Sequence, residues 1–429
     1  MIDRIDVKIG GGLDVPLPRM ARVRQTFESD RVADVAAAVA AEFGKPGVGD
    51  KIKAGQKIAV GAGSRGVANV GAAVAAVVAQ IKARGGEPFV FPAMGSHGGA
   101  TVEGQTATLA GYGITEQAVG APIRATMDTV VLGEMADGTP IHTDRFAHEA
   151  DGVVVVNRIK PHTSFRGPVE SGLLKMIAIG MGKIEGAAIL HTHGMDVFGE
   201  FIPRVGSFIL ERMPILFGLG LVENGYDETA IVEAIPAAQL QTREPELQTE
   251  AKRLMARIYF DDIDVLVIEE MGKEISGAGF DPNITGRQHR WLPWVELPRV
   301  KKIVVLELTE KTKGNATGLG LADVITMKLF KKIDFPATYA NVITSAFLDG
   351  AAIPLIMNTE QEAIQLAVKT TLRVKPGDHR VVRIANTLDL GEILVSEPML
   401  EEVRAHPKME IVGAPAPFLF DAQGNLAAA

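Results

Sequence analysis

Two histidines that follow apolar segments are the first candidates for chemistry in this sequence. His97 lies within Gly95-Ser96-His97-Gly98-Gly99, and His162 follows the apolar run 152–156. An imidazole titrates near neutral pH, which suits it to accept or donate a proton during catalysis. The glycines around His97 leave its ring uncovered, so we favour a functional role over a purely structural hydrogen-bonding one.

Lys175 is the second candidate, because it lies inside an apolar, glycine-punctuated run that extends from Leu173 to Gly182. Burying a lysine costs free energy unless the amine is paired, neutral or chemically modified. A covalent attachment would remove that cost by removing the charge. The alternative is an ordinary lysine whose stem is buried and whose ammonium reaches the surface; the local sequence leaves both open.

His191 and His193 are expected to end a helix that begins near Gly182. Residues two apart lie on different faces of a helix, so these histidines are not expected to bind one metal ion together. One of them should face the site and the other should point away.

Two glycine-containing turns could bind anions. In Gly61-Ala62-Gly63-Ser64-Arg65-Gly66, backbone N–H groups could cradle an anion and Arg65 could add a bidentate donor; the alternative is a tight turn with an exposed arginine. The loop 272–287 holds Asn283 and Arg287, and Arg287 could pair with a carboxylate or phosphate; the alternative is a long surface connection. Trp291 and Trp294 would form an apolar wall near this loop or be buried in the core.

The elements that position these residues follow an alternating pattern of apolar β-branched runs and helical runs, which is typical of an α/β fold. Strands are expected at 57–63, 88–92, 152–156, 215–222, 229–235, 264–268, 302–308 and 380–384. Helices are expected at 67–81 with Ser64 as N-cap, from 101, at 195–212, 243–259, 322–332 and 360–372, with a hairpin turn at Asp137-Gly138. Successive strand–loop–helix units predict a parallel sheet with its loops gathered at the carboxyl ends of the strands.

The length of 429 residues suggests more than one domain. We expect two α/β domains with parallel or mixed sheets and the active site in the cleft between them. The first would comprise residues 1–257 together with a C-terminal return, 405–429, and would bind the cofactor. The second, 258–404, would close over the site.

Composition excludes several classes of protein. The chain has no cysteine, so disulfides, thiolate metal sites and cysteine nucleophiles are absent. Its net charge of −8 and the lack of a sizeable basic patch argue against a nucleic-acid partner. No window holds the roughly 18 apolar residues of a membrane span, and no apolar signal segment opens the chain, so a cytoplasmic location is expected.

Taken together, these motifs resemble the nickel-pincer-nucleotide-dependent lactate racemase family over nearly the whole chain. The resemblance rests on four pieces that occur in the family's order: Ser64-Arg65; Gly95-Ser96-His97; Pro161-His162, Gly172, Lys175 and His191; and Asp281-Pro282-Asn283. Each piece is weak alone, and together they are fairly specific.

The resemblance implies a role for each candidate. Lys175 would carry the nickel pincer nucleotide covalently, with Ser64 and Arg65 also at the cofactor, and His191 would ligate the nickel. His97 and His162 would be the catalytic acid–base pair, and Arg65, Asn283 and Arg287 would bind the substrate. The reaction would be racemisation or epimerisation of a 2-hydroxy acid by reversible hydride transfer, and it would depend on cofactor-biosynthesis proteins.

Departures from the family's pattern suggest a substrate other than lactate. Lactate-specific members have an aspartate where this chain has Ala62, and Gln and Lys where it has Gly286 and His289. Arg287 would be the replacement carboxylate clamp. Two other functions remain open: a metallohydrolase that uses His97, His162 and His191 around one metal, and a non-catalytic phosphate- or nucleotide-binding protein.

Overall fold

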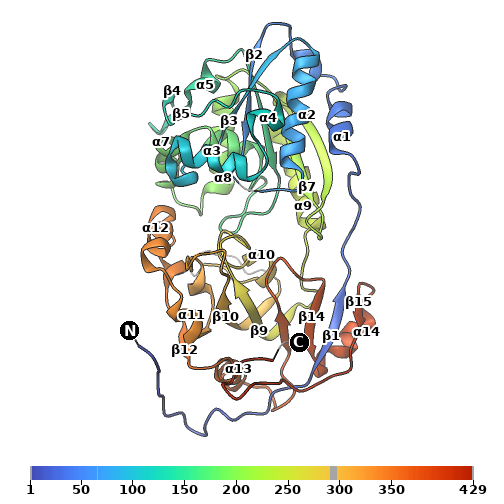
Figure 1. Cartoon of the computed structure of the whole chain (residues 1–429), viewed down its shortest axis with the longest axis vertical. Helices are drawn as coiled ribbons and strands as arrows, with labels where there is room; N and C mark the ends of the chain where they lie inside the picture. The colour runs from blue at the N-terminus through green and yellow to red at the C-terminus, as the bar shows by residue number, and fades with distance from the viewer. Residues whose placement is uncertain (1, 65, 290–296, 428–429) are drawn as a thin grey trace. The chain divides into compact units, whose positions relative to one another are not determined.

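The chain folds into two compact units, and each has its own β-sheet. The computed structural model describes residues 2–64, 66–289 and 297–427 (Figure 1). One unit runs from Glu28 to Met255, and the other combines the residues up to Phe27 with those from Ala256 onward. Below, they are called the 28–255 unit and the 256–429 unit. The boundary after Met255 falls two residues before the one expected after residue 257. The residues up to Phe27 were expected in the first domain but belong to the 256–429 unit.

A five-stranded sheet forms the centre of the 28–255 unit, in the order β3-β2-β6-β7-β8. The first four strands are parallel, and β8 is antiparallel to β7. The strands are β2 (Lys57–Ala62), β3 (Glu87–Pro92), β6 (Gly152–Arg158), β7 (Ile215–Glu223) and β8 (Thr229–Pro236). All five were expected from their apolar runs, because strands covered on both faces are apolar throughout.

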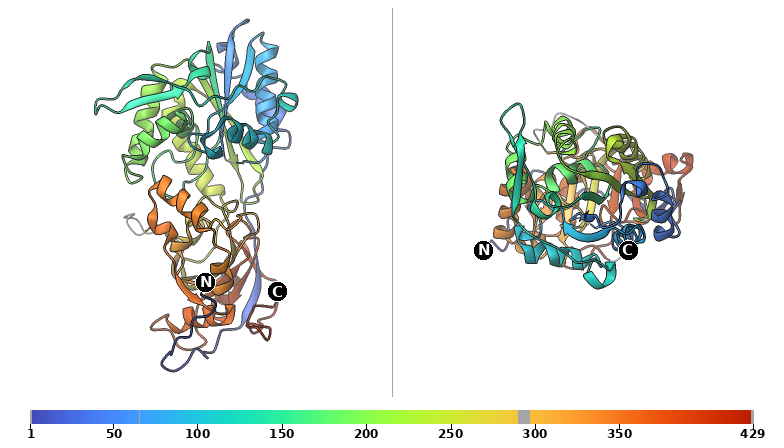
Figure 2. Two further views of the ribbon diagram at one scale, coloured as in Figure 1. Left: turned by 60° about the vertical axis from the view of Figure 1, so that its left-hand side comes forward. Right: turned by 90° about the horizontal axis from the view of Figure 1, so that it is seen from above.

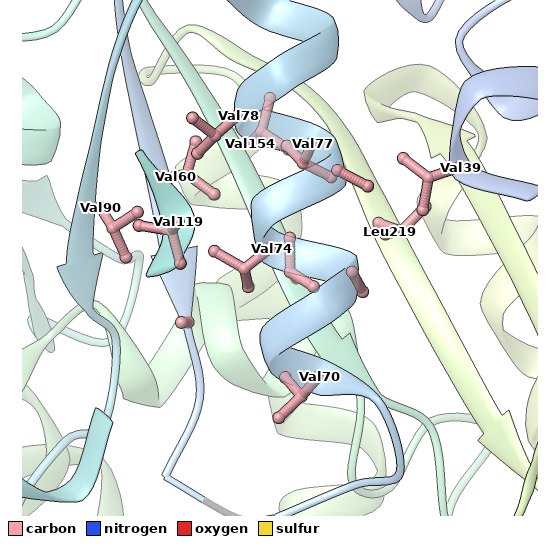
Figure 3. Packing of buried hydrophobic residues seen from close by; sticks show 14 of the residues in the cluster. Val39, Val60, Val70, Val74, Val77, Val78, Val90, Val119, Val154 and Leu219 are labelled. Atoms are coloured by element: carbon pink, nitrogen blue, oxygen red, sulfur yellow. The ribbon is translucent and has the colours of Figure 1, made fainter. Parts of the chain in front are cut away.

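Helices cover this sheet. They are α1 (Val35–Glu42), α2 (Val70–Ala83), α3 (Val102–Gly111), α4 (Glu116–Val119), α5 (Arg145–His148), α6 (Leu173–Lys175), α7 (Lys183–His191), α8 (Phe198–Leu210) and α9 (Leu240–Leu254). Figure 3 shows α2 placing Val70, Val74, Val77 and Val78 against strand residues such as Val60. Small and β-branched side chains let this helix lie close to the sheet, and their burial supplies the stabilising hydrophobic term.

The expected hairpin is present as an antiparallel pair, β4 (Thr129–Glu134) and β5 (Pro140–Asp144). Figure 2 shows the pair, coloured blue-green, projecting from the rest of its unit. Its last residue, Asp144, caps the short helix α5 by accepting a hydrogen bond from the Ala147 N–H at 3.0 Å.

The 256–429 unit contains an eight-stranded mixed sheet in the order β12-β11-β10-β9-β13-β14-β1-β15. The strands are β1 (Met20–Gln25), β9 (Asp262–Met271), β10 (Arg299–Leu308), β11 (Val324–Thr326), β12 (Leu355–Met357), β13 (Val381–Ile384), β14 (Glu392–Ser396) and β15 (Met409–Ile411). Its helices are α10 (Pro282–Thr285), α11 (Met327–Lys331), α12 (Phe335–Ser345), α13 (Glu360–Lys369) and α14 (Leu400–Ala405). The strands from β12 to β13 are parallel, and β14, β1 and β15 are antiparallel additions. The expected fold class, two α/β domains with parallel or mixed sheets, is confirmed.

Several expectations differ from the structure. The segment 405–429 does not return to the first domain, because β15 pairs with β1 in the eight-stranded sheet. The expected helix 322–332 begins instead as strand β11, whose apolar residues pair with β10. Ser64 does not cap α2; the residue before that helix is Asn69, in the left-handed region at φ 61°. Within the described residues, no helix is long and apolar enough to cross a membrane.

Candidate active site

His97 lies in the turn that joins β3 to α3, and its side chain is exposed. Its Nδ1 is hydrogen-bonded to the hydroxyl of Ser64, which follows β2. Because β2 and β3 are parallel neighbours, their carboxyl ends bring these two residues together. Arg65, the next residue, lies outside the described residues, as do Trp291 and Trp294.

Glycine is required in the His97 turn for steric reasons. Gly98 has φ +65°, and a Cβ atom there would lie 2.8 Å from the backbone nitrogen of Gln105. A side chain at this position would therefore push α3 away from the turn. The glycines leave space for the imidazole, and close packing against α3 is a second reason for them.

His162 is fixed by hydrogen bonds on both its backbone and its ring. Its backbone N–H donates to the Oε2 of buried Glu170 at 2.7 Å, and its Nδ1 accepts from the Ser164 N–H at 3.0 Å. With Nδ1 as acceptor, the neutral ring carries its proton on Nε2. The ring packs against Phe165, with centroids 4.3 Å apart.

Lys175 ends α6 and is followed by a π-helical turn, Met176–Gly180. Such turns are rare and occur often at functional sites. The side chain is half-buried, and its Nζ lies 5.3 Å from the centroid of the Phe165 ring. The amine is therefore directed to the same aromatic ring that supports His162, and not out into bulk solvent.

His191 is the last residue of α7 and is half-buried. Its Nδ1–H donates to the carbonyl oxygen of Ala187 at 2.5 Å, so the lone pair of the neutral ring is on Nε2. Burial lowers the pKa of His191, and the nearby positive charge of Lys175 lowers it further. Both effects favour the neutral imidazole that binds a metal ion.

A buried aromatic pair joins these residues into one site. Phe165 and Phe198 pack edge to face with centroids 5.6 Å apart, and the ring of His191 lies 5.3 Å from that of Phe198. His162 and Lys175 border Phe165, while His191 borders Phe198. Neither phenylalanine was singled out from the sequence, where an isolated aromatic residue carries no signal of such a role.

The His97 turn is connected to the segment that carries Lys175. The backbone N–H of Gly95 donates to the carbonyl oxygen of Gly180, the last residue of the π-helical turn, at 2.9 Å. Ser64, His97 and His162 thus follow the carboxyl ends of β2, β3 and β6, which are neighbours in the sheet. His193 points elsewhere, as expected for one of the two: its ring stacks on Phe201, and its Nε2 contacts the Thr139 hydroxyl at 3.0 Å.

Glu244 fixes the start of α6 through a hydrogen bond to its backbone. It was not singled out from the sequence. Its side chain is fully buried, and its Oε2 accepts a hydrogen bond from the Leu174 N–H at 2.9 Å. Burial raises the pKa of this carboxyl group to about 7. A Cβ atom at Gly172 would lie 1.8 Å from Glu244 Oε1, so a side chain at this position would displace the carboxyl group.

Asn283 and Arg287 lie in the 256–429 unit. Asn283 is on α10, and its side-chain amide donates to Asp281 Oδ1 at 2.8 Å. The Arg287 guanidinium is 3.1 Å from Asp323 Oδ2 and donates to the carbonyl oxygens of Val300, Lys301 and Leu321. These contacts favour a structural role for Arg287 over that of a substrate clamp.

Neither alternative function finds support in the described residues. Among residues 2–64, 66–289 and 297–427, no group of three or more His, Asp or Glu side chains is arranged to hold a metal ion. At the start of α2, the Ala68 N–H donates to the Glu223 carboxylate at 2.7 Å. The protein's own carboxylate thus occupies this amide, which follows the 61–66 turn that was expected to cradle an anion.

Part of the chain matches a known protein family. Residues 17–201 match the family model described as lactate racemase N-terminal domain. Among solved structures, the chain is similar to the lactate racemase apoprotein from Thermoanaerobacterium thermosaccharolyticum, with a TM-score of 0.53 and 11% identity over 85% of this chain and 94% of that chain. At that identity the likeness shows the fold alone. None of the curated proteins compared with the chain matches it.

Proposed function

Because residues 17–201 belong to the lactate racemase N-terminal domain family, we propose that this protein is a racemase or epimerase of a 2-hydroxy acid other than lactate. The matched segment contains six of the residues singled out from the sequence: Ser64, Arg65, His97, His162, Lys175 and His191. Asn283 lies outside it and is proposed as a substrate contact on the motif alone.

One observation carries the proposal: Lys175 and His191 border the same buried aromatic pair, Phe165 and Phe198. An amine and an imidazole that border one pair of packed rings suit a cofactor that would be attached to the first and ligated by the second. The charge of Lys175 also lowers the pKa of His191, which places the two groups within electrostatic reach.

The residues present fit a nickel pincer nucleotide. His191 would offer Nε2 to nickel because its Nδ1–H is hydrogen-bonded to the carbonyl oxygen of Ala187, and the other ligands would come from the cofactor. Lys175 is the attachment point, with Ser64 and Arg65 proposed at the nucleotide. When bound, the cofactor supplies the hydride acceptor that no side chain can provide.

The side chains of this chain would handle the protons. Nε2 of His97 would take the proton of the substrate hydroxyl group while its Nδ1 stays bonded to Ser64. His162 would face the substrate with Nε2, because Nδ1 is held by the Ser164 N–H. In the reverse direction the same atoms return the proton to the hydroxyl oxygen. The apolar rings of Phe165 and Phe198 would exclude water from the keto acid formed on the way.

Three positions support a substrate other than lactate. Ala62, at the place of a family aspartate, is fully buried and offers no polar group. Gly286 has no side chain, and His289 is 4% exposed with its Nδ1 bonded to Asp349 at 3.0 Å. The carboxylate contacts of a lactate-specific site are therefore not reproduced, and a larger or polyhydroxylated acid is the proposed substrate. The partners would be this small molecule and the proteins that build the cofactor.

Labelled substrates test this proposal. The protein is produced together with cofactor-biosynthesis proteins and screened against 2-hydroxy acids for loss of optical rotation. With the active acid deuterated at C2, hydride transfer predicts that the label remains on C2 of the inverted product. Loss of the label to solvent would instead indicate abstraction of a proton from carbon and would contradict the mechanism.

A further inference from the structure

Lys183 is a fully buried charged residue that the proposed mechanism does not use. Its Nζ lies 2.8 Å from Asp144 Oδ2, and both side chains have an exposed fraction of 0%. Transfer of two charges from water into the interior is costly, so a buried pair of this kind needs further hydrogen bonds to be tolerated. The backbone of Lys183 is also in the left-handed region, at φ 52°, which is unfavourable for a lysine.

The Lys183 ammonium uses its remaining donors at the base of the His97 turn. It donates to the carbonyl oxygen of Pro92, the last residue of β3, at 2.5 Å and to Gln105 Oε1 at 3.4 Å. The pair thus joins the end of β5, the start of α7, the end of β3 and helix α3 at one point.

Gln105 connects Lys183 to the His97 turn through hydrogen bonds. The side chain is fully buried, and its Nε2 donates to the carbonyl oxygens of Gly95 at 2.9 Å and His97 at 3.2 Å. Because the ammonium has no acceptor, it can face only the amide oxygen of Gln105. Lys183 therefore fixes the orientation of the amide, and the NH₂ group must face the two carbonyl groups.

The turn needs such a restraint because its own sequence is permissive. Gly95, Gly98 and Gly99 all have positive φ angles and lack side chains that could anchor them. The side chain of His97 is exposed and is hydrogen-bonded to Ser64, so the Gln105 contacts restrain the backbone of the turn and not the ring directly.

We propose that Lys183, held by Asp144 and acting through Gln105, is a positioning residue that fixes the backbone of the His97 turn. The inference rests on the proposed function for its catalytic consequence, while the effect on the His97 backbone and ring is independent of it. No contact between Lys183 and the substrate is implied.

The experiment compares Lys183→Met, Gln105→Leu and the double variant, each in the full chain. If Lys183 acts through Gln105, each single variant lowers kcat on the order of 10- to 100-fold with little change in KM, as expected for a displaced catalytic group. The double variant then loses no more than the worse single variant. The proposal would be overturned if the fold-loss in kcat of the double variant equalled the product of the two single losses. It would also be overturned if Gln105→Leu kept kcat within about twofold of wild type.

A second readout needs no activity and no cofactor. In protein labelled with ¹⁵N-histidine, the ring resonances of His97 should shift or broaden in both single variants, while those of His162 stay in place. Leu109→Ala is the matched control, because Leu109 is a fully buried residue of the same helix without a contact to the turn carbonyls. It should lower stability and leave the His97 resonances unchanged; unchanged His97 resonances in Gln105→Leu would contradict the proposal even if the protein proved to have another activity.

Discussion

His191 donates its Nδ1–H to the carbonyl oxygen of Ala187, one helical turn earlier, and this hydrogen bond sets which nitrogen is available for a ligand. The remaining lone pair of the neutral ring is on Nε2, and burial favours this neutral form by lowering the pKa of His191. Metal-binding histidines in proteins commonly use their second nitrogen in this way. The helix thus orients the Nε2 lone pair of His191 for the nickel ion that we propose it binds.

His191→Ala should separate nickel binding from cofactor attachment. Without the imidazole, the nickel retained per chain should fall by at least about tenfold, whereas the mass added at Lys175 should persist. Elemental analysis and intact-protein mass spectrometry measure the two quantities. His193→Ala is the control, because that ring is bonded to Thr139 and should leave nickel unchanged. Equal loss of nickel in both variants would contradict the assignment of His191.

His97→Ala should stop turnover without releasing the cofactor. Removal of a general acid–base group lowers the rate on the order of 10²- to 10⁴-fold. The exposed His97 side chain supports little packing, so thermal stability should change little. Initial rates and the melting temperature check these outcomes, and a variant that kept more than about a tenth of the activity would remove His97 from the mechanism.

Phe165→Leu should weaken the site more than a core substitution of similar size elsewhere. Phe165 is fully buried and contacts both His162 and Lys175, so the smaller side chain leaves a cavity beside two functional groups. We expect a loss of about 1–3 kcal/mol in stability together with a large loss of kcat. Phe43→Leu, at a fully buried ring packed on Phe217, is the control and should lower stability alone. If both variants kept normal kcat, the aromatic pair would not be part of the site.

Glu244→Gln should change how stability depends on pH. The pKa of Glu244 is higher in the folded protein than in the unfolded chain, so the free energy of unfolding is greatest at low pH, where the carboxyl group is protonated in both. This stability is lost as the pH rises from about 4.5 to about 7. Glutamine keeps the acceptor for the Leu174 N–H but cannot ionise. Relative to wild type, the free energy of unfolding of the variant should therefore rise by about 3 kcal/mol between pH 4.5 and pH 8, since each pKa unit corresponds to about 1.4 kcal/mol.

Urea unfolding at several pH values measures this difference. Glu246→Gln provides the control, because Glu246 lies on the same helix but is largely exposed and pairs with Arg243. Its difference from wild type should stay nearly flat across this range. A flat profile for Glu244→Gln would show that the buried carboxyl group titrates at an ordinary pH.

The strands and the ends of the strands could be predicted from the sequence, because apolar runs identify buried parallel strands and the loops that follow them meet at one edge. That reasoning brought His97 and His162 to the same edge of the sheet. The sequence did not reveal that Ser64 contacts His97, since a serine before a helical run has the same pattern as an N-cap.

The supporting residues could not be predicted for a different reason. Glu170, Gln105 and Glu244 act through hydrogen bonds to backbone groups up to 70 residues away. Such contacts depend on how the completed fold brings segments together, and no local pattern encodes them. The same holds for 405–429, whose short strand finds its partner in β1 at the other end of the sequence.

The mass of the intact protein tests the central claim most directly. After production with cofactor-biosynthesis proteins, wild type should carry an added mass of one mononucleotide on a peptide containing Lys175, with nickel near one ion per chain. Lys175→Ala should lose the added mass, the nickel and the activity together, whereas Lys53→Ala, at an exposed lysine of the same unit, should lose none of them. Full activity in Lys175→Ala, or an active wild type without the adduct, would contradict the account.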